Sequence, residues 1–234
     1  MSYDKYIVMK DMSFHINPGE IFLIIGGSGC GKSTLLKYLL GLKFTRPGHI
    51  FYDTKDINSI IGDNGFYGQR IGVLYQSGAL WSSMTVKENV ALPLEMHTSL
   101  STDEIDDIVQ LKLSSVGLKG FGDLYPAQLS GGMRKRAGLA RAMALDPEIL
   151  FFDEPSAGLD PISSRRLDDL ILELKESLGM TVVIVTHELA SIFGIGTNAI
   201  YLDSQTKTIS AYGPPKQLAT ETGTNVAKFL SRSV

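Results

Sequence analysis

An apolar run that leads directly into a glycine-rich loop is the feature that most constrains the fold of this chain. Residues 21–25 form a continuous apolar stretch of strand length, and residues 26–34 read Gly-Gly-Ser-Gly-Cys-Gly-Lys-Ser-Thr. This loop matches the pattern G-x-x-x-x-G-K-[ST], which joins a buried strand to the start of a helix. Leucines on one face of residues 35–40, followed by Gly41, predict that helix and its end. The sequence therefore predicts an α/β fold built around this strand, loop and helix.

The loop has the composition of a phosphate-binding site. Its glycines can turn backbone N–H groups inward, and these amides bind phosphate oxygens together with the positive end of the following helix. Lys32 is predicted to contact the β- and γ-phosphates of a nucleotide, and the Ser33 hydroxyl to ligate Mg²⁺. Cys30 is expected to be a small filler, with a redox role as the alternative. The residues predicted to bind nucleotide in this loop are Gly26, Ser28, Gly29, Cys30, Gly31, Lys32, Ser33 and Thr34.

Two carboxylates follow a second apolar strand, which is predicted over Ile149–Phe152. Asp153 is predicted to be a second protein ligand of Mg²⁺. Because side chains alternate along a strand, Glu154 points another way and is predicted to polarise the water that attacks the γ-phosphate. Taken alone, two acids after a strand are more often part of a turn or a helix cap. With the phosphate loop present, the pair predicts hydrolysis of a nucleotide.

Alternation of strands and helices along the rest of the chain favours a largely parallel sheet. A capping box at Ser101–Glu104 begins one helix of a helical stretch between residues 86 and 144, and Asp160 with Pro161 begins another that runs to Leu178. Further predicted elements are strands over His49–Tyr52, Ile71–Tyr75 and Thr181–Thr186, a hairpin of Ala199–Leu202 and Thr208–Ala211, a loop at residues 62–68, and a short C-terminal helix that contains Val226, Phe229 and Leu230.

Composition excludes several classes of protein. The chain has 234 residues, a net charge of −3 and a single cysteine. This charge is far from the basic footprint of proteins that bind duplex nucleic acid, so no nucleic-acid partner is expected. One cysteine cannot form an intrachain disulfide or a cysteine-rich zinc site, and it fits a reducing compartment. No apolar run approaches the roughly 20 residues that a membrane-spanning helix needs. We therefore expect a cytoplasmic protein whose membrane role depends on a partner.

A short sequence before a basic helix selects among the classes of nucleotide-hydrolysing protein. Residues 129–133 read Leu-Ser-Gly-Gly-Met. Ser130 is a good N-cap, and Gly131 and Gly132 leave amides uncovered at the helix start, which makes a second anion site. With this signature sequence in place, the chain resembles the ABC-transporter ATPase family over nearly all of its length. The matching motifs, in the family's order, are the phosphate loop, Gln76, residues 129–133, Asp153 with Glu154, residues 157–160 and His187.

The resemblance implies a P-loop NTPase core of the ABC ATPase type, with an antiparallel β region and a helical subdomain insertion. We expect a single domain over residues 1–234, with the core in 1–85 and 146–234 and the insertion, which carries the signature sequence, in 86–145. The resemblance also implies ATP and Mg²⁺ as cofactors and a head-to-tail homodimer of ATPase subunits. In that dimer, Ser130–Gly132 of one chain contact the γ-phosphate that the phosphate loop of the other chain holds.

Four further residues receive roles from the resemblance alone. Gln76 is assigned to the Mg²⁺ site, Asp160 to the nucleotide site and His187 to a contact with the γ-phosphate. Tyr3 stands where the family places an aromatic residue that stacks on adenine, and Tyr6 is the less favoured alternative. The family has a strand before this aromatic residue, and we expect that strand to be missing here.

Residues 74–81, which include Ser-Gly-Ala-Leu-Trp after Gln76, and residues 84–90 are similar to ATPases of lipid-transport systems of the Mla and Mce type. The similarity implies an ATPase that powers movement of phospholipid or another envelope lipid through a partner permease, with an Mce-type or periplasmic lipid-binding component. Such an ATPase would lie on the cytoplasmic face of the inner membrane. The alternative is another small-molecule cargo, such as an amino acid or peptide. A P-loop kinase and an ABC ATPase that acts on nucleic acid or ribosomes are competing classes.

Leu80, Trp81 and Met84 are apolar residues that follow Gln76. The resemblance places the permease contact in this region, and buried aromatic residues often anchor interfaces. The alternative is that these three side chains pack inside the helical insertion.

Overall fold

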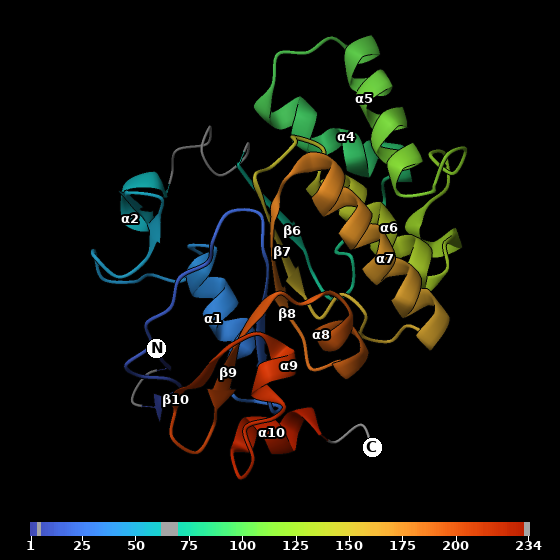
Figure 1. The fold of residues 1–234 in the computed structure, drawn as a ribbon. Helices are drawn as coiled ribbons and strands as arrows, with labels where there is room; N and C mark the ends of the chain where they lie inside the picture. Colours follow the sequence, from blue (N-terminus) through green and yellow to red (C-terminus); the bar gives the residue numbers. More distant parts are fainter. Residues whose placement is uncertain (4–5, 62–69, 232–234) are drawn as a thin grey trace. The chain divides into compact units, whose positions relative to one another are not determined.

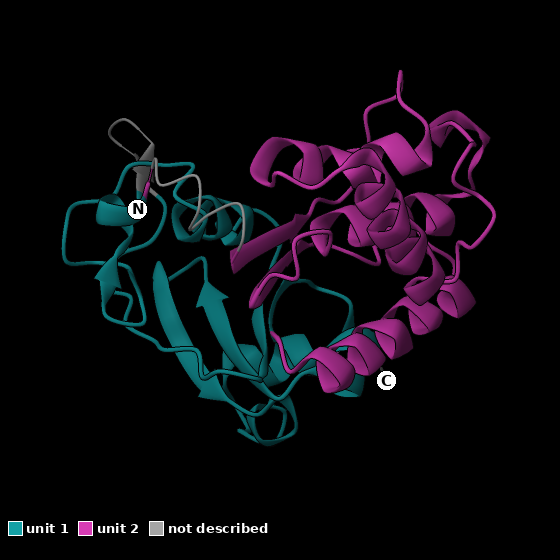
Figure 2. Cartoon of the chain, turned by 90° about the horizontal axis from the view of Figure 1, so that it is seen from above, with its two compact units in different colours: residues 1–60, 181–234 teal, residues 61–180 magenta. Residues whose placement is uncertain are grey.

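The computed structural model describes residues 1–3, 6–61 and 70–231. The chain divides into two compact units: unit 1 comprises residues 1–60 and 181–234, and unit 2 comprises residues 61–180 (Figure 2). The predicted division into a core and an insertion over 86–145 differs in its bounds from these two units, and it stays a prediction. The predicted loop at 62–68 lies outside the described residues.

Unit 1 is built on a sheet whose inner pairings are parallel (Figure 1). β3 (Ile21–Gly26) pairs in parallel with β8 (Thr181–Val185) and with β9 (Asn198–Asp203), and β9 pairs antiparallel with β10 (Thr208–Gly213). Every residue of β3 and β8 is buried, which explains why both strands read as continuous apolar runs. The predicted strands at 21–25 and 181–186 and the predicted hairpin are confirmed.

Short helices and two-residue strands complete unit 1. α1 (Lys32–Leu39) follows β3, and Gly41 takes left-handed backbone with a φ of 66° just past the helix end, as predicted. The predicted strand at His49–Tyr52 is reduced to β4 (Phe51–Tyr52), because Gly48 turns the chain with a φ of 83° at the predicted strand's start. The remaining elements are β1 (Ser2–Tyr3), β2 (Tyr6–Ile7), β5 (Lys55–Asp56), α2 (Ile57–Ile60), α8 (Leu189–Ile195), α9 (Pro215–Leu218) and α10 (Asn225–Leu230).

Unit 2 combines a parallel strand pair with longer helices. β6 (Ile71–Leu74) pairs in parallel with β7 (Ile149–Asp153). As predicted, Ser101 and Glu104 form a capping box, and Asp160 caps a helix by accepting two backbone N–H groups at 3.0 Å. Throughout the described ranges, each helix is too short or too polar to cross a bilayer. The helices of this unit are α4 (Val86–His97), α5 (Thr102–Ser115), α6 (Gly131–Ala142) and α7 (Pro161–Leu178), with a 3₁₀ turn at Pro126–Gln128.

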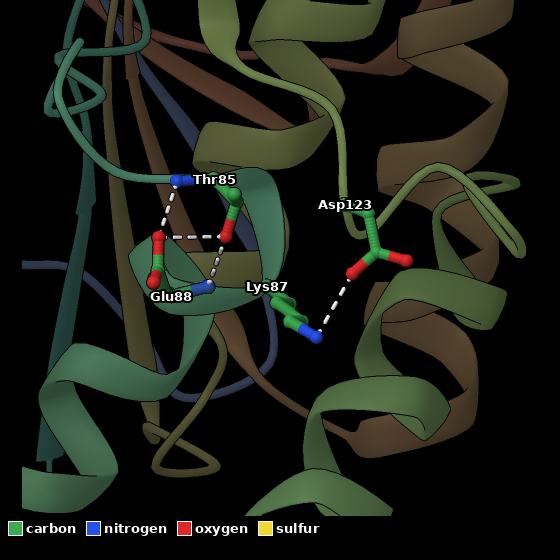
Figure 3. Close-up of polar contacts among 4 residues, drawn as sticks. All are labelled: Thr85, Lys87, Glu88 and Asp123. Carbon is green, nitrogen blue, oxygen red and sulfur yellow. Dashed lines mark hydrogen bonds and ion pairs between the residues drawn. The ribbon is translucent and has the colours of Figure 1, made fainter.

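A capping box and an ion pair, both missing from the sequence-based prediction, fix the start of α4 (Figure 3). Thr85 Oγ1 accepts the Glu88 N–H at 3.3 Å, and Glu88 Oε2 accepts the Thr85 N–H at 2.6 Å, which makes a second capping box. In the first turn, Lys87 Nζ pairs with Asp123 Oδ1 at 2.8 Å. The capping box therefore stabilises the first turn of α4, and the ion pair joins this turn to the segment after α5.

Glycines bring α6 close to β6 and to the loop that follows this strand. A Cβ at Gly72 of β6 would lie 2.2 Å from the main-chain oxygen of Ala142. A Cβ at Gly138 of α6 would lie 2.8 Å from the main-chain oxygen of Gly78. Because both contacts are with backbone atoms, a side chain at either position would force the backbones apart. These two glycines set the spacing between α6 and the β6 region.

Candidate functional site

The phosphate loop joins β3 to α1 in unit 1, and two of its glycines are required by close contacts. A Cβ at Gly26 would lie 2.7 Å from the main-chain oxygen of Leu202, and a Cβ at Gly31 would lie 2.6 Å from Val8 Cγ1. Both glycines also have a positive φ, 152° at Gly26 and 101° at Gly31, which side chains disfavour. The path of the loop therefore depends on glycine at both positions.

The N-terminus of α1 is arranged to receive an anion. Its N-cap is Gly31, no side chain caps it, and its first turn holds no acidic residue. Uncapped amides and the helix dipole together favour a phosphate at this position. Lys32 is buried, and its Nζ donates to the main-chain oxygens of Gly26 at 2.9 Å and Gly27 at 3.1 Å. The ammonium therefore lies against the loop and adds positive charge beside the amides.

Cys30 is buried inside the phosphate loop, and its Sγ would lie 2.7 Å from a Cβ at Gly26. Burial raises the pKa of the thiol, while the charge of Lys32 opposes that shift. A thiol with a raised pKa stays protonated at neutral pH and is a poor nucleophile. Of the two readings of Cys30, the structure favours the small filler over the redox role.

His187 and the phosphate loop lie at the same edge of the sheet in unit 1. His187 follows β8, and β8 runs parallel to β3, which leads into the loop. The Thr186 N–H donates to the main-chain oxygen of Ile24 at 3.3 Å, so the pairing continues almost to His187. The carboxyl ends of parallel strands are where α/β proteins bind ligands. The side chain of His187 is exposed at this edge.

Asp153 and Glu154 are neighbours at the end of β7 in unit 2 but differ in backbone conformation. Glu154 has a φ of 49°, in the left-handed region, which costs about 1–3 kcal/mol for a residue with a side chain. Its main-chain oxygen accepts the Ala157 N–H at 3.1 Å and Lys135 Nζ at 3.3 Å. The backbone conformation therefore changes between Asp153 and Glu154.

The carboxylates at the end of β7 shift the pKa values of two neighbouring side chains. Burial lowers the pKa of the Lys135 ammonium, and the charges of Glu154 and Asp153 oppose this shift. Burial raises the pKa of the Tyr75 hydroxyl, and Asp153 raises it further. Lys135 and Tyr75 are therefore within electrostatic range of these acids. Because Tyr75 directly precedes Gln76, the end of β6 and the end of β7 form one polar region.

The predicted ligands of Mg²⁺ suit that ion chemically. Ser33 offers a hydroxyl, Gln76 an amide oxygen and Asp153 a carboxylate, and Mg²⁺ prefers oxygen ligands. Within the described residues, no three or more His, Cys, Asp and Glu side chains form a cluster that could hold a metal ion. Such a cluster is not needed, because Mg²⁺ in nucleotide sites is held by one or two carboxylates together with phosphates and water. The residues present therefore fit Mg²⁺.

An arginine absent from the sequence-based prediction holds the loop after β6, which carries Gln76, on α6. Arg141 donates to the main-chain oxygens of Ala79 at 2.8 Å and of Gly78 at 3.1 Å. A Cβ at Gly78 would lie 2.9 Å from the main-chain oxygen of Arg134, so this loop also touches the helix backbone. Arg141 is one of several basic residues in α6, and only the fold distinguishes it from the others.

A buried asparagine, also absent from the prediction, organises the next part of this loop. Asn89 Oδ1 accepts the Trp81 N–H at 2.7 Å, and Nδ2 donates to the main-chain oxygens of Trp81, Met84 and Thr85 at 2.9–3.2 Å. The Trp81 side chain is 60% exposed, so it does not pack inside the helical segment. Of the two alternatives for Trp81, the surface position is the one observed. An asparagine inside an apolar helix was the available signal, because such a side chain needs partners.

The signature sequence begins α6, as predicted. Ser130 is the N-cap, its Oγ accepts the Met133 N–H at 3.2 Å, and the first turn holds no acidic residue. A Cβ at Gly131 would lie 3.6 Å from Leu159, and one at Gly132 would have its nearest neighbour at 3.8 Å, which are ordinary contacts. Neither glycine has a positive φ. Packing and backbone strain within this chain therefore do not require glycine at either position.

The predicted site residues divide between the two units. Unit 1 holds the phosphate loop, His187 and Tyr3, which lies in β1 with its backbone paired to Tyr6. Asp160 caps α7, and hydrogen bonds from Ser163 lower the pKa of its carboxyl. The contact of Asp160 with nucleotide stays a prediction. The predicted residues in unit 2 are Gln76, Ser130, Gly131, Gly132, Asp153, Glu154 and Asp160.

Comparison with known proteins gives consistent matches. The family described as ABC transporter matches residues 9–157. MlaF of Haemophilus influenzae, an intermembrane phospholipid transport system ATP-binding protein, is 39% identical over 96% of this chain and 84% of its own length. The probable ribonucleotide transport ATP-binding protein mkl of Mycobacterium tuberculosis is 39% identical over 98% of this chain, which spans 64% of that protein. A dimeric post-hydrolysis structure of the ATP-binding cassette MJ0796, bound to ADP and Pi, superposes with a TM-score of 0.80 and 30% identity, covering 92% of this chain and 94% of that one.

Proposed function

The chain belongs to the ABC transporter family, and we propose that its ATP hydrolysis drives phospholipid or another envelope lipid through a membrane permease. It is an ATPase of this family. The observation that carries the lipid cargo is the 39% identity to a phospholipid transport ATP-binding protein over 96% of the chain. A relative with the same 39% identity is named for ribonucleotide transport, so a transport experiment has to decide which cargo is moved.

In the proposed reaction, the phosphate loop and Lys32 bind the β- and γ-phosphates of ATP. The uncapped amides at Gly31 and the buried ammonium support this role. Ser33, Asp153 and Gln76 are the residues that would hold Mg²⁺, and the bound ion would neutralise phosphate charge and orient the reacting groups. The remaining roles in nucleotide binding are those of Tyr3 stacking on adenine and of Gly26, Ser28, Gly29, Cys30, Thr34 and Asp160 lining the site.

Glu154 is the proposed activator of the attacking water. Its carboxylate accepts a proton from the water as the water oxygen bonds to the γ-phosphorus and the bond to ADP breaks. Assistance of this kind is worth on the order of 10²–10⁴ in rate. His187, at the carboxyl edge of the sheet in unit 1, donates a hydrogen bond to the γ-phosphate. The left-handed backbone at Glu154 supports a specialised role, because strain of this kind collects at functional sites.

The proposed active form is a homodimer in which Ser130–Gly132 of one chain bind the γ-phosphate held by the other. The support lies in the two glycines, which no packing contact or backbone strain within the described part of the chain requires. A backbone without side chains at a helix start lets an anion approach the amides closely. The structure of MJ0796 is dimeric, and this chain shares 30% identity with it.

The permease partner is proposed to bind at the loop that carries Trp81. The backbone of this loop is fixed by Asn89, while the Trp81 side chain is 60% exposed. A rigid loop that presents an exposed aromatic residue is suited to anchor a partner. Binding there would hold the chain on the cytoplasmic face of the inner membrane, in a complex that contains an Mce-type or periplasmic lipid-binding component.

The cargo is tested with the complete transporter. The chain is purified with the membrane components that accompany it, and the complex is reconstituted into phospholipid vesicles that contain a fluorescent phospholipid. We expect ATP-dependent movement of that lipid, and no movement with a Glu154→Gln complex prepared in parallel. Mass spectrometry of the purified complex identifies whether an Mce-type component is present.

The same complex is tested with ribonucleotides, amino acids and peptides as cargo. If one of these is transported with ATP and stimulates hydrolysis, while the phospholipid does neither, the lipid proposal is wrong. The membership of the chain in the family would be unaffected by that result.

A further inference from the structure

Lys135 is a buried, charged residue of α6 that has no role in the proposed reaction. It lies further along the helix that begins with Ser130, and only 5% of its surface is exposed. Burial of an ammonium is unfavourable unless the charge finds partners. Its Nζ donates to the main-chain oxygen of Glu154 at 3.3 Å. The buried ammonium therefore hydrogen-bonds to the main chain of the proposed activator of water.

The backbone of Glu154 needs this kind of support. Its φ of 49° is unfavourable for a residue with a side chain. Pro155 follows, and a residue before proline is also kept out of the right-handed helical region, so few compact conformations remain. The main-chain oxygen of Glu154 accepts two donors, the Ala157 N–H at 3.1 Å and Lys135 Nζ. Two donors on one oxygen fix the orientation of the peptide group that follows Glu154.

We propose that Lys135 is a positioning residue for Glu154, which ties the water-activating carboxylate to the helix that carries Ser130–Gly132. Because α6 begins with the signature sequence and also carries Lys135, a displacement of its N-terminus reaches the Glu154 backbone through one side chain. This inference rests on the proposed role of Glu154 and deepens it. Lys135 itself contacts neither phosphate nor water in this scheme.

The competing explanation is that Lys135 only contributes to folding. Lys112 on α5 provides a matched comparison in the same unit. It is also a buried lysine, 7% exposed against 5% for Lys135, but its ammonium pairs with Asp146 rather than with the end of β7. Replacing either lysine by methionine removes a buried charge and keeps a similar length and volume. Only the change at Lys135 removes a donor from Glu154.

The test compares ATP hydrolysis by the full chain in its transporter complex for Lys135→Met, Lys135→Arg and Lys112→Met. A misplaced reactive group costs up to about 100-fold in rate, so we expect Lys135→Met to lower kcat about 10- to 100-fold with the KM for ATP nearly unchanged. Lys135→Arg, which keeps an N–H donor, should recover most of the kcat. Lys112→Met should keep a wild-type kcat, and any loss should appear in the melting temperature.

Three results would overturn the positioning role. They are a wild-type kcat for Lys135→Met, equal losses of kcat and melting temperature for Lys135→Met and Lys112→Met, and no recovery with arginine. Should Lys135→Met not fold, Lys135→Gln takes its place, since glutamine stays polar but its side chain is too short to donate to the Glu154 oxygen. A lowered kcat at unchanged KM for that variant supports the role, and a wild-type kcat overturns it.

Glu154→Gln, measured in parallel, separates this inference from the proposed function. If Glu154→Gln hydrolyses ATP normally, the role of Glu154 itself is wrong. If Glu154→Gln stops hydrolysis while Lys135→Met does not, only the role of Lys135 is wrong.

Discussion

At the scale of single residues, the two carboxylates at the end of β7 are neighbours with different backbone conformations. Asp153 ends the strand, and Glu154 turns into left-handed backbone. The order of the two acids is plain in the sequence, but the turn is not, because it depends on contacts with Ala157 and Lys135. Residue type therefore predicts the chemistry available, and the fold determines how each group is aimed.

Replacing Glu154 by glutamine should stop turnover without stopping ATP binding. Glutamine has a similar shape but cannot accept a proton from the water, so the rate of hydrolysis should fall by about 10²–10⁴. Single-turnover hydrolysis and nucleotide-binding measurements check both parts. The matched control is Glu148→Gln, since Glu148 is an exposed acid of the same unit that pairs with Arg70. Unchanged hydrolysis by Glu154→Gln would contradict the assignment.

Replacing Gly132 by alanine should separate folding from function. The added Cβ has its nearest neighbour at 3.8 Å, so the melting temperature should not fall, whereas ATP hydrolysis should be lost because the methyl group blocks approach to the helix amides. Gly138→Ala is the contrasting variant, since its Cβ would lie 2.8 Å from a main-chain oxygen and should lower the melting temperature. Normal hydrolysis by a stable Gly132→Ala protein would argue against a phosphate at the signature sequence.

At the scale of elements, local patterns in the sequence predict more than pairings between distant segments. β3, β8 and the caps of α5 and α7 were predictable because apolar runs and capping residues act over a few positions. The contacts of Arg141, Asn89 and Lys135 were not, because each joins segments whose proximity only the fold creates. The motifs of the candidate site can thus be recognised in the sequence, and their roles stay predictions, whereas the side chains that hold its loops in place could not be predicted.

The loop after β6 should lose its order when Asn89 is replaced by alanine. The Trp81 N–H and the Met84 main-chain oxygen lose this partner, while the Trp81 and Thr85 oxygens each keep a backbone donor. An unsatisfied buried polar group costs about 1–3 kcal/mol. Thermal unfolding should detect this loss, and permease association should fall as well. Trp81→Ala should lose association alone, because this residue is 60% exposed. Met96→Ala, at the far end of α4 and 67% exposed, should lose neither association nor stability. Full association of Trp81→Ala would exclude this loop as the contact.

The capping box of α5 should make stability depend on pH in a defined direction. The Ser101 hydroxyl and its backbone N–H donate to Glu104 and lower the pKa of that carboxyl. A pKa that is lower in the folded state stabilises the fold above the unfolded value of about 4.3, and the contribution disappears as the pH falls through the folded value. The melting temperature of Glu104→Ala should therefore lie below wild type at pH 7, with the gap shrinking below about pH 4. A constant gap would show that the carboxylate charge is irrelevant.

At the scale of the whole molecule, the predicted α/β fold of the family is confirmed by the match to a solved cassette. The site residues come from both compact units, so neither unit alone contains the predicted set. The signature sequence adds a second requirement, since the N–H groups of Gly131 and Gly132 have no assigned partner among the residues that the structure describes. Complete activity is therefore expected only from an assembly of two chains.

Mixing two inactive variants should restore ATP hydrolysis if the dimer is head to tail. Lys32→Ala removes the phosphate-binding lysine, and Ser130→Phe blocks the signature sequence, so each variant alone should be inactive. In a mixed dimer both changes fall on the same nucleotide site, and the other site is intact. Activity that rises on mixing and scales with the fraction of mixed dimers checks the arrangement. Mixtures no more active than the separate variants would contradict it.

Cys30 has a practical consequence for following such assemblies. It is the single cysteine of the sequence, and its thiol is buried with a raised pKa. The thiolate is the form that attacks a thiol-reactive dye, so Cys30 should react slowly in the native protein. A fluorophore can therefore be attached at a cysteine introduced on the exposed surface, for example at position 96, without first removing the native one. Labelled chains would then report association and dissociation in real time by energy transfer.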